Sequence, residues 1–369
     1  MITGHGGNII EIARQIGCNP ADIHDMSSNM NPLGPFPGLM GHLKNRMDAI
    51  LSLPQADASG CINRFAKRYG VDPRRVLAGN GTTQLIYLIP KALGSKKALI
   101  LGPTYADYAD ACRMHRVPHG FYLADEEDEF RPDLDKFAAA IRDADTIFIC
   151  NPNNPTGTLI SKTDVAILCR RYPEKQFVID EAYMPFVGPD HQFSMIGSEL
   201  PNLLVLNSMS KIFRVPGLRI GFLVAPTAIA DRFRRFAMPW SLNSLAQEAI
   251  LYLMSQRESI EEFVQKTQQF MIDEIKYLNR KLNKKEGGRL FPSHTSFILM
   301  KLPKGLTAES VVASLLTRRI LVRNCTNFFG LSHRFIRISL KTSDINVLMA
   351  DALIEILRRR GMESARKVA

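Results

Sequence analysis

Short apolar runs alternate with amphipathic segments through the middle of the chain. The runs are rich in branched and aromatic residues, as buried strands are, and they span 97–101, 146–150, 176–179, 203–206 and 220–224. The segments between them place apolar residues at helical spacing and have the length of crossover helices, at 82–93, 106–115 and 162–171. This alternation predicts an α/β fold with a mostly parallel sheet covered by helices.

A different pattern begins after residue 240. The segment 244–283 is helical in pattern and free of Pro and Gly, and we expect it to connect to another domain. Short strands are expected at 295–301, 320–323 and 335–339, with helices at 308–317 and 344–360. These elements predict a small α+β domain.

The length of the chain supports this division, since 369 residues exceed the size at which one hydrophobic core usually keeps growing. We expect an N-terminal arm and part of the small domain in 1–50, a large domain in 51–265 and the C-terminal small domain in 266–369. Within the arm, a first helix is expected at 8–16. The Pro- and Gly-rich stretch 31–38 is expected to lie over the functional site.

The net charge of +11 comes from 47 Lys and Arg against 36 Asp and Glu, and it suits phosphorylated small molecules or nucleic acid. Part of the excess lies in 358–367, which is typical of a solvated helix end. The sequence has no zinc-type spacing, no recognition motif and no interleaving of aromatic and basic residues. We therefore expect neither a metal site nor a nucleic-acid partner.

The six cysteines are scattered without a CxxC pair, and several lie in apolar segments, so reduced thiols are expected. The N-terminus lacks a basic segment followed by an apolar stretch, and no apolar run reaches the length that spans a bilayer. These features predict a cytoplasmic protein with no membrane segment.

The stretch 208–221 carries the strongest chemical signal, because it sets one lysine among hydroxyls, a glycine turn and an arginine. Lys211 could bond covalently to an aldehyde cofactor. Ser208, Ser210 and Arg219 could supply the hydrogen bonds and positive charge that a phosphate group on this cofactor needs. The alternative is a serine-rich loop before a buried strand.

A second candidate phosphate site lies at 77–84, where a strand ends in glycines and hydroxyls and a helix begins. Gly81 and Thr82 would stand at the helix N-terminus, which carries free N–H groups and partial positive charge. The alternative is an ordinary glycine turn followed by a threonine cap.

Three further segments place polar or aromatic residues just after predicted strands, at the sheet edge where ligands bind in open α/β folds. Asn154 could donate a hydrogen bond to an oxygen on a cofactor ring. The alternative is that this segment is a proline turn capped by asparagine. Asp180 needs a cationic partner, and a protonated pyridine nitrogen is one; backbone N–H groups are the alternative. Tyr183 could reach the ring oxygen, and Tyr105 could stack on the ring or belong to the core.

Two arginines in the C-terminal part suit a substrate with two anionic groups. Guanidinium groups bind planar oxyanions with two hydrogen bonds and do not titrate. Arg323 and Arg337 could therefore bind the carboxylate and the phosphate of a phosphorylated amino acid. The alternative places Arg337 at the surface of an edge strand.

Taken together, these residues resemble, in order and approximate spacing, the fold-type I pyridoxal-phosphate enzymes of the class I/II aminotransferase superfamily. The resemblance covers nearly the whole chain and is greatest to threonine-phosphate decarboxylases of cobalamin biosynthesis, with histidinol-phosphate aminotransferases as close relatives. It rests on the opening His-Gly-Gly-Asn at 5–8, the segment 26–34, and the segment 322–337. One departure is Gln84, where relatives often have Glu.

The resemblance implies a large domain with a mostly parallel seven-stranded sheet between helices, a small α+β domain, and a homodimer with the active site at its interface. It implies pyridoxal 5'-phosphate as cofactor, with Lys211, Asp180 and Tyr183 as catalytic residues. The implied cofactor-binding residues are Gly81, Thr82, Tyr105, Asn154, Asp180, Tyr183, Ser208, Ser210, Lys211 and Arg219. The implied substrate-binding residues are Asn8, Asn31, Asn154, Arg323 and Arg337.

The reaction that the resemblance implies is decarboxylation of L-threonine O-3-phosphate, or of L-serine O-phosphate, to a phosphorylated amino alcohol for corrinoid biosynthesis. The alternative is transamination, with histidinol phosphate as donor and 2-oxoglutarate as acceptor. The orientation of the bonds at the substrate's α-carbon selects between the two outcomes. A third alternative, a binding protein that has lost the chemistry, conflicts with the presence of Lys211, Asp180 and Asn154.

Overall fold

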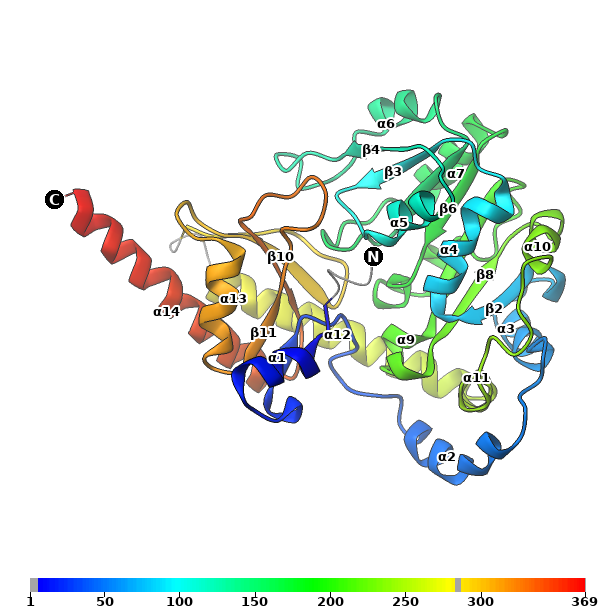
Figure 1. The fold of residues 1–369 in the computed structure, drawn as a ribbon, viewed down its shortest axis with the longest axis horizontal. Coiled ribbons are helices and arrows are strands. Elements are labelled where there is room, and N and C mark those ends of the chain that lie inside the picture. Colours follow the sequence, from blue (N-terminus) through cyan, green and yellow to red (C-terminus); the bar gives the residue numbers. More distant parts are fainter. Residues whose placement is uncertain (1–5, 283–286, 369) are drawn as a thin grey trace. The chain divides into compact units, whose positions relative to one another are not determined.

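The computed structural model describes residues 6–282 and 287–368. These residues form two compact units. The large unit comprises Gly34–Asn154 and Thr158–Lys266, and the small unit comprises the described residues of Met1–Leu33 and Thr267–Ala369 together with Pro155–Gly157. Figure 1 shows the elements of both units in chain order.

The large unit contains a seven-stranded sheet with the strand order β2-β8-β7-β6-β5-β3-β4. Its strands are β2 (Val76–Asn80), β3 (Ala98–Gly102), β4 (His119–Leu123), β5 (Thr146–Cys150), β6 (Gln176–Asp180), β7 (Leu203–Ser208) and β8 (Ile220–Val224). Only β8 runs antiparallel to its neighbours. The mostly parallel sheet is thus confirmed, and the five predicted strands lie within two residues of their expected bounds.

Strand side chains point alternately to the two faces of a sheet, and the helices of the large unit cover both faces. They are α2 (Leu39–Asn45), α3 (Ser59–Tyr69), α4 (Gly81–Leu93), α5 (Asp107–Met114), α6 (Leu134–Ile141), α7 (Lys162–Arg171), α8 (Asp190–Phe193), α9 (Met209–Ile212), α10 (Thr227–Arg234) and α11 (Ser244–Ser255). On one face, Ile89, Tyr108 and Phe233 of α4, α5 and α10 form a core with strand residues. On the other face, Phe222 of β8 stacks on Phe65 of α3, with ring centroids 4.1 Å apart.

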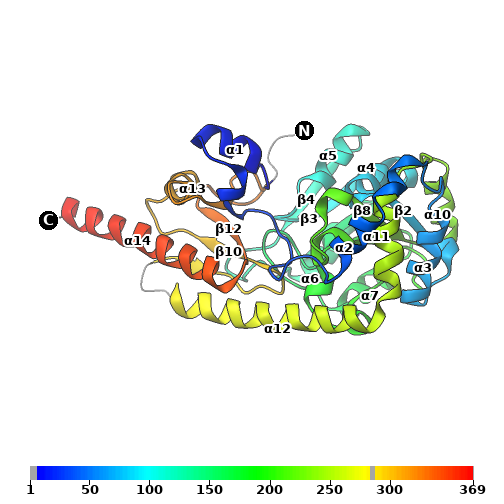
Figure 2. The same ribbon diagram turned by 90° about the horizontal axis from the view of Figure 1, so that it is seen from below.

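The expected single helical segment at 244–283 is two helices, α11 and α12 (Arg257–Lys281). Gln256 separates them with φ −104° and ψ 52°, and its carbonyl accepts the N–H of Ile260 in the first turn of α12. Since neither Gly nor Pro marks the break, the sequence pattern gave no sign of it. Figure 2 shows α12 as one uninterrupted helix.

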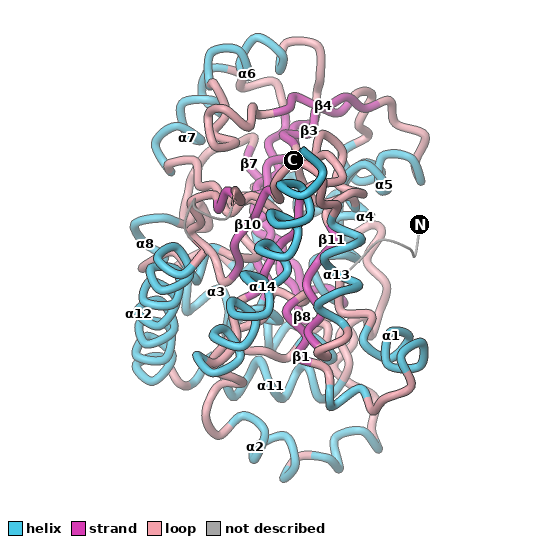
Figure 3. The backbone as a smooth tube through the Cα atoms, turned by 90° about the vertical axis from the view of Figure 1, so that its left-hand side faces the viewer, coloured by secondary structure: helices cyan, strands magenta, loops and turns pink. Residues whose placement is uncertain are grey.

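The small unit contains a five-stranded sheet with the order β1-β11-β12-β10-β9. Its strands are β1 (His24–Met26), β9 (Arg289–Leu290), β10 (Phe297–Lys301), β11 (Ile320–Asn324) and β12 (Phe335–Ser339), and its helices are α1 (Ile9–Ile16), α13 (Ala308–Leu316) and α14 (Ser343–Val368). Side chains of α1 and α13 pack with Leu321 of β11 in one apolar cluster, and Figure 3 shows α13 beside β11. The N-terminal strand β1 pairs in parallel with β11, so both ends of the chain build this sheet.

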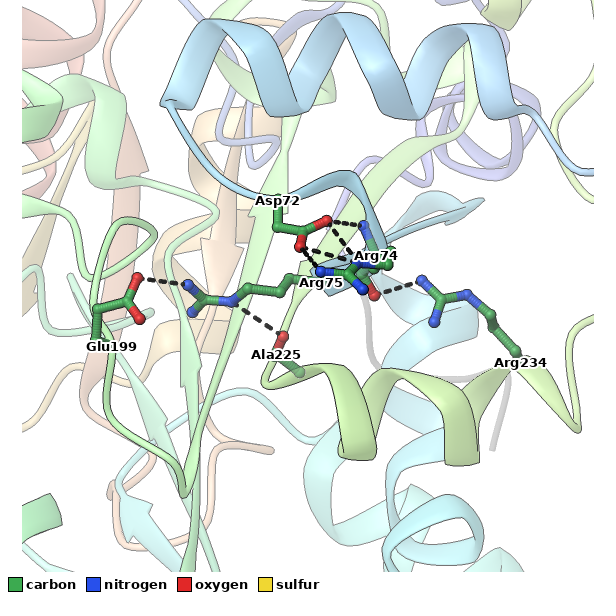
Figure 4. A network of polar contacts seen from close by, with 6 residues as sticks. All are labelled: Asp72, Arg74, Arg75, Glu199, Ala225 and Arg234. Carbon is green, nitrogen blue, oxygen red and sulfur yellow. Dashed lines mark hydrogen bonds and ion pairs between the residues drawn. The ribbon is translucent and has the colours of Figure 1, made fainter.

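Several of the excess basic residues have structural partners in the large unit, as Figure 4 shows. Asp72 begins the 3-10 helix Pro73–Arg75 and bonds Arg74. Arg75 donates to Glu199 and to the carbonyl of Ala225, and Arg234 of α10 donates to the carbonyl of Arg74. These bonds fix the start of β2, so this part of the positive charge serves the fold.

The six cysteines have free thiols. Across the part of the chain that the structure describes, no helix combines the length and apolar character of a membrane span.

Candidate active site

The carboxyl ends of β6 and β7 bring a buried carboxylate near a lysine. Asp180 is the last residue of β6 and is 4% exposed. The neighbouring strand β7 ends at Ser208, and Lys211 follows in α9. Burial raises the pKa of Asp180, and the positive charge of Lys211 is one of the influences that oppose this rise, so the two side chains lie within electrostatic range. The structure therefore brings together the two residues on which the predicted chemistry depends.

Each carboxylate oxygen of Asp180 accepts one hydrogen bond from a neighbouring residue. Burial raises the pKa of Asp180, and the largest opposing effect comes from Tyr108. The Tyr108 hydroxyl donates to Oδ2 at 2.8 Å, and the Ala182 N–H donates to Oδ1 at 3.0 Å. Since each carboxylate oxygen accepts more than one hydrogen bond, Asp180 can still accept one from a cationic ring nitrogen.

The N-terminus of α4 forms a cradle of backbone with the start of β8. A Cβ atom built on Gly81, which has φ +73°, would lie 2.5 Å from Nη2 of Arg219. The Gly81 N–H donates to the Arg219 carbonyl at 2.9 Å, and strand pairing places Ser208 opposite Gly221. Position 81 favours glycine because its φ of +73° lies in the left-handed region that other residues rarely adopt.

This cradle fits a phosphate group by the chemistry of its donors. The Asn80 side chain makes no capping bond to α4, and the first-turn N–H groups of a helix have no acceptor within the helix itself. Arg219 lies exposed beside it, and the hydroxyl of Ser210 lies 3.5 Å from the Ile220 carbonyl at the same strand end. Helix N–H groups, hydroxyls and one guanidinium form the donor set that a phosphate dianion requires.

Gln84 performs a local task in this cradle. Its side-chain oxygen accepts the Asn80 N–H at 2.6 Å, and its amide nitrogen donates to Ser241 at 3.2 Å. A Gln in place of Glu thus keeps the acceptor at the start of α4. The departure from relatives at this position leaves the cradle intact.

The aromatic residues predicted for the ring gather near Asp180. Tyr105 contacts Tyr108 edge to face, with ring centroids 5.9 Å apart. Burial raises the pKa of Tyr105, and Asp107, Tyr183 and Asp180 act in the same direction, which places these groups close to its hydroxyl. Tyr183 itself is buried. The structure therefore groups Tyr105 and Tyr183 with the carboxylate.

The asparagines after β5 differ in their environments. Asn151 braces its loop by two bonds to the backbone of Ile160, at 2.9 and 2.8 Å. Asn153 accepts from Thr104 at 2.6 Å and donates to the carbonyl of Pro103 at 2.8 Å. Asn154 is buried at the end of this segment of the large unit. Asn151 and Asn153 therefore shape the loop that presents Asn154.

Tyr108 is the residue near the carboxylate to which the sequence interpretation assigned no role. It stands in α5, whereas Tyr105 precedes that helix, so no helical spacing links the two residues. No local signal in the sequence identifies Tyr108, because its acceptor Asp180 is 72 positions away.

In the small unit, two arginines face each other across neighbouring strands. The Cα atoms of Arg323 and Arg337 are partners in the pairing of β11 with β12. Arg337 is 4% exposed and donates to the Ser27 carbonyl at 2.6 Å, while Arg323 donates to Asn327 at 2.7 Å. Burial lowers the pKa of Arg323 to about 10, and the charge of Arg337 acts in the same direction. An anion bound beside them would relieve this repulsion.

The N-terminal motif lies against these arginines within the small unit. The Gly7 N–H donates to the Ser27 hydroxyl at 2.9 Å, and a Cβ atom on Gly6 would lie 3.5 Å from Cδ of Arg323. Asn8 is exposed and begins α1. His5, which belongs to the same motif, lies outside the described residues.

Asn31 is fully buried in the small unit and bonds with its neighbours. Its amide nitrogen donates to the Thr267 hydroxyl at 2.9 Å, and its oxygen accepts the Leu33 N–H at 2.9 Å. These bonds give Asn31 a structural role, and substrate binding by Asn31 stays a prediction.

Comparison with known proteins relates the whole chain to one family. A family model described as aminotransferase class I and II matches residues 22–352. Threonine-phosphate decarboxylase of Salmonella typhimurium is 30% identical over 96% of this chain and 97% of its own length. Histidinol-phosphate aminotransferase of Methanocaldococcus jannaschii is 29% identical over 90% of this chain and 88% of its own.

A bifunctional protein of adenosylcobalamin biosynthesis from Leptospira interrogans is 31% identical over 98% of this chain, but the chain spans 42% of its length. Among solved structures, L-threonine-O-3-phosphate decarboxylase from Porphyromonas gingivalis has a TM-score of 0.79 at 31% identity, covering 90% of this chain and 99% of its own. Histidinol-phosphate aminotransferase from Clostridium acetobutylicum has a TM-score of 0.81 at 28% identity, with the same coverage.

Proposed function

Because the chain belongs to the class I and II aminotransferases, a family of pyridoxal-phosphate-dependent enzymes, we propose that it decarboxylates L-threonine O-3-phosphate to a phosphorylated amino alcohol. L-Serine O-phosphate is the related substrate to compare. The product would enter corrinoid biosynthesis, the pathway named for the relative from Leptospira interrogans.

The cofactor would be held by residues of the large unit. When bound, pyridoxal phosphate supplies an electron sink that weakens a bond at the substrate's α-carbon. Lys211 would carry the covalent attachment, and Asp180 would accept a hydrogen bond from the pyridine nitrogen. Tyr105, Asn154 and Tyr183 would contact the ring. The phosphate would be bound by Gly81, Thr82, Ser208, Ser210 and Arg219.

The observation that carries the choice of substrate is the facing pair Arg323 and Arg337. A phosphorylated amino acid has a carboxylate and a phosphate, and two guanidinium groups match both by charge and geometry. Arg337 would bind the carboxylate, and Arg323 would bind the phosphate with help from Asn8 and Asn31. Arg337 would also hold the carboxylate in the orientation that favours its loss.

An aminotransferase is the second candidate, and the similarity to histidinol-phosphate aminotransferases at 28% to 29% identity favours it. Histidinol phosphate would then be the amino donor and 2-oxoglutarate the acceptor. Lys211 would move a proton at the α-carbon where the decarboxylase loses carbon dioxide.

One assay separates the two reactions. The purified enzyme with pyridoxal phosphate is supplied with L-threonine O-3-phosphate, and carbon dioxide is measured; a second sample receives histidinol phosphate and 2-oxoglutarate, and glutamate is measured. We expect carbon dioxide and a phosphorylated amino alcohol from the first sample. Formation of glutamate without carbon dioxide would reject the decarboxylase activity and support the aminotransferase activity. The Lys211→Ala variant serves as the control and should be inactive in both samples.

By the same family relationship we propose a homodimer with the active site at the subunit interface. Light scattering on the eluting protein peak should give a mass near twice 41.4 kDa. A mass of one chain at micromolar concentration would contradict the dimer.

A further inference from the structure

Tyr108 is hydrogen-bonded to the carboxylate of Asp180 and is almost completely excluded from solvent. Its side chain is 1% exposed, and its hydroxyl donates to Oδ2 of Asp180 at 2.8 Å. The two residues are 72 positions apart and come from α5 and β6. A buried tyrosine hydroxyl thus has the carboxylate as its acceptor.

The aromatic ring of Tyr108 is held on two sides. It stacks on Phe148 with ring centroids 5.4 Å apart and 20° between the planes, and it meets Tyr105 edge to face. Phe148 and Cys150 lie on one face of β5, and the Cα atom of Cys150 is the pairing partner of Asp180. The hydroxyl therefore has a fixed place next to the carboxylate.

We propose that Tyr108 is a positioning residue that orients Asp180 toward the pyridine nitrogen of the cofactor and keeps Asp180 ionised. This inference rests on the proposed function, because it requires pyridoxal phosphate next to Asp180. With the Tyr108 hydroxyl on Oδ2 and the Ala182 N–H on Oδ1, the carboxylate has a single orientation. The ring nitrogen then meets an acceptor already in place.

The other charged and titratable groups around Asp180 make the Tyr108 hydroxyl important. Lys211 on α9 favours the ionised carboxylate, whereas Asp107 at the start of α5 opposes it. Cys150 on β5 and Tyr105 also interact with Asp180. Burial opposes ionisation most strongly, and among the groups that offset it, Tyr108 has the largest effect on the pKa of Asp180.

Removal of the hydroxyl tests this role in the full-length protein. We expect Tyr108→Phe to weaken the binding of pyridoxal phosphate by roughly 10- to 100-fold, the range for a hydrogen bond to a charged group. The matched control is Tyr172→Phe, since Tyr172 is also buried but donates to the carbonyl of Ala138 at 2.6 Å. This control should bind the cofactor within about twofold of the unmodified protein.

The pH dependence of cofactor affinity separates positioning from a purely structural effect. Without its donor, Asp180 takes up a proton at a higher pH, so the affinity of Tyr108→Phe should begin to fall at a higher pH than that of the unmodified protein. If Tyr108→Phe does not fold, 3-fluorotyrosine placed at position 108 alone provides the test. Its more acidic hydroxyl is a stronger donor and should move the fall in affinity to lower pH.

A double substitution shows whether the effect passes through Asp180. In the background of Asp180→Asn, the further change Tyr108→Phe should alter the affinity by less than about threefold. Unchanged affinity and an unchanged pH profile in Tyr108→Phe would overturn the role of Tyr108 alone. Unchanged affinity in Asp180→Asn would instead overturn the proposed cofactor site.

Discussion

Gly221 of β8 lies against the amide nitrogen of Thr82 at the start of α4. A Cβ atom built on Gly221 would be 2.3 Å from this nitrogen and 2.5 Å from the carbonyl carbon of Gly81. Real Cβ atoms do not approach backbone so closely, so a side chain at 221 must move the N-terminus of α4. The cradle between α4 and β8, which we propose to bind the cofactor phosphate, therefore depends on a glycine within the sheet.

Gly221→Ala is expected to lower both stability and cofactor affinity. Overpacking of this kind costs about 1–3 kcal/mol, and the displaced helix end should weaken pyridoxal-phosphate binding at least roughly tenfold. Chemical denaturation and cofactor titration measure the two effects. Gly217→Ala is the control, because a Cβ atom there would have open space around it. Equal behaviour of the two variants would refute the close approach as the cause.

Arg337→Lys should reduce kcat/KM for L-threonine O-3-phosphate by roughly 30-fold or more. The ammonium group keeps the charge but cannot bond a carboxylate at two points, and about 2 kcal/mol is typical for such a loss. Steady-state kinetics provides the measurement. Arg334→Lys is the matched control, since Arg334 of the same unit bonds the carbonyl of Leu302, and it should stay within about threefold. A normal kcat/KM in Arg337→Lys would exclude a two-point contact with substrate.

Glu181 is expected to make the stability of the large unit depend on pH. It is fully buried, accepts the Met195 N–H at 2.7 Å and bonds Ser194, and burial raises its pKa from 4.5 to about 8. The folded chain therefore binds the proton more tightly than the unfolded chain does. The resulting stabilisation is complete below pH 4.5 and is lost as the pH rises through about 8.

Glu181→Gln removes the titrating group and should flatten this pH dependence. The difference in unfolding free energy between the unmodified protein and Glu181→Gln, from denaturation at several values between pH 5 and 9, should fall as the pH rises. Glu199→Gln is the control because Glu199 is exposed. A constant difference across the range would mean that Glu181 holds no proton in the folded protein.

Asn31 donates a hydrogen bond to Thr267, and substitutions of the two residues can distinguish a structural role of Asn31 from a role in substrate binding. Thr267→Val removes the partner of Asn31 and should cost about 1–2 kcal/mol of stability with kcat/KM within about threefold. Asn31→Ala should cost a similar amount of stability. If Asn31 also contacts substrate, its variant alone should raise KM for L-threonine O-3-phosphate. Equal KM values for both variants would assign Asn31 to the fold only.

The elements that were predicted correctly are those with a distinctive hydrophobic pattern in their own residues. The buried strands β5 and β8 are continuous apolar runs, and their bounds match the prediction at both ends. The strand β4 is half-buried at the sheet edge, and β1 has three residues, so neither has a distinctive pattern. Their pairing depends on distant partners, which a local pattern does not contain.

The same distinction holds for the candidate site. Short local motifs of a few consecutive residues predicted the roles of Lys211, Asp180 and Gly81. The role of Tyr108 could be predicted only from the position of α5 on the sheet, because its hydrogen-bond acceptor Asp180 is 72 residues away. The bond between Arg337 and the Ser27 carbonyl joins positions 310 apart, so no local pattern could predict the strand–segment contact that holds this arginine.

The pairing of β1 with β11 has a consequence for the order in which the protein is made. The ribosome adds Val322 of β11 roughly 15 to 60 seconds after its pairing partner Met26 of β1, at the usual rate of synthesis. During that interval the first strand has no neighbour, while the intervening large unit can already collapse on its own sheet. During synthesis β1 therefore stays unpaired until β11 has been made, and a polypeptide that stops before residue 320 would lack the strand with which β1 pairs.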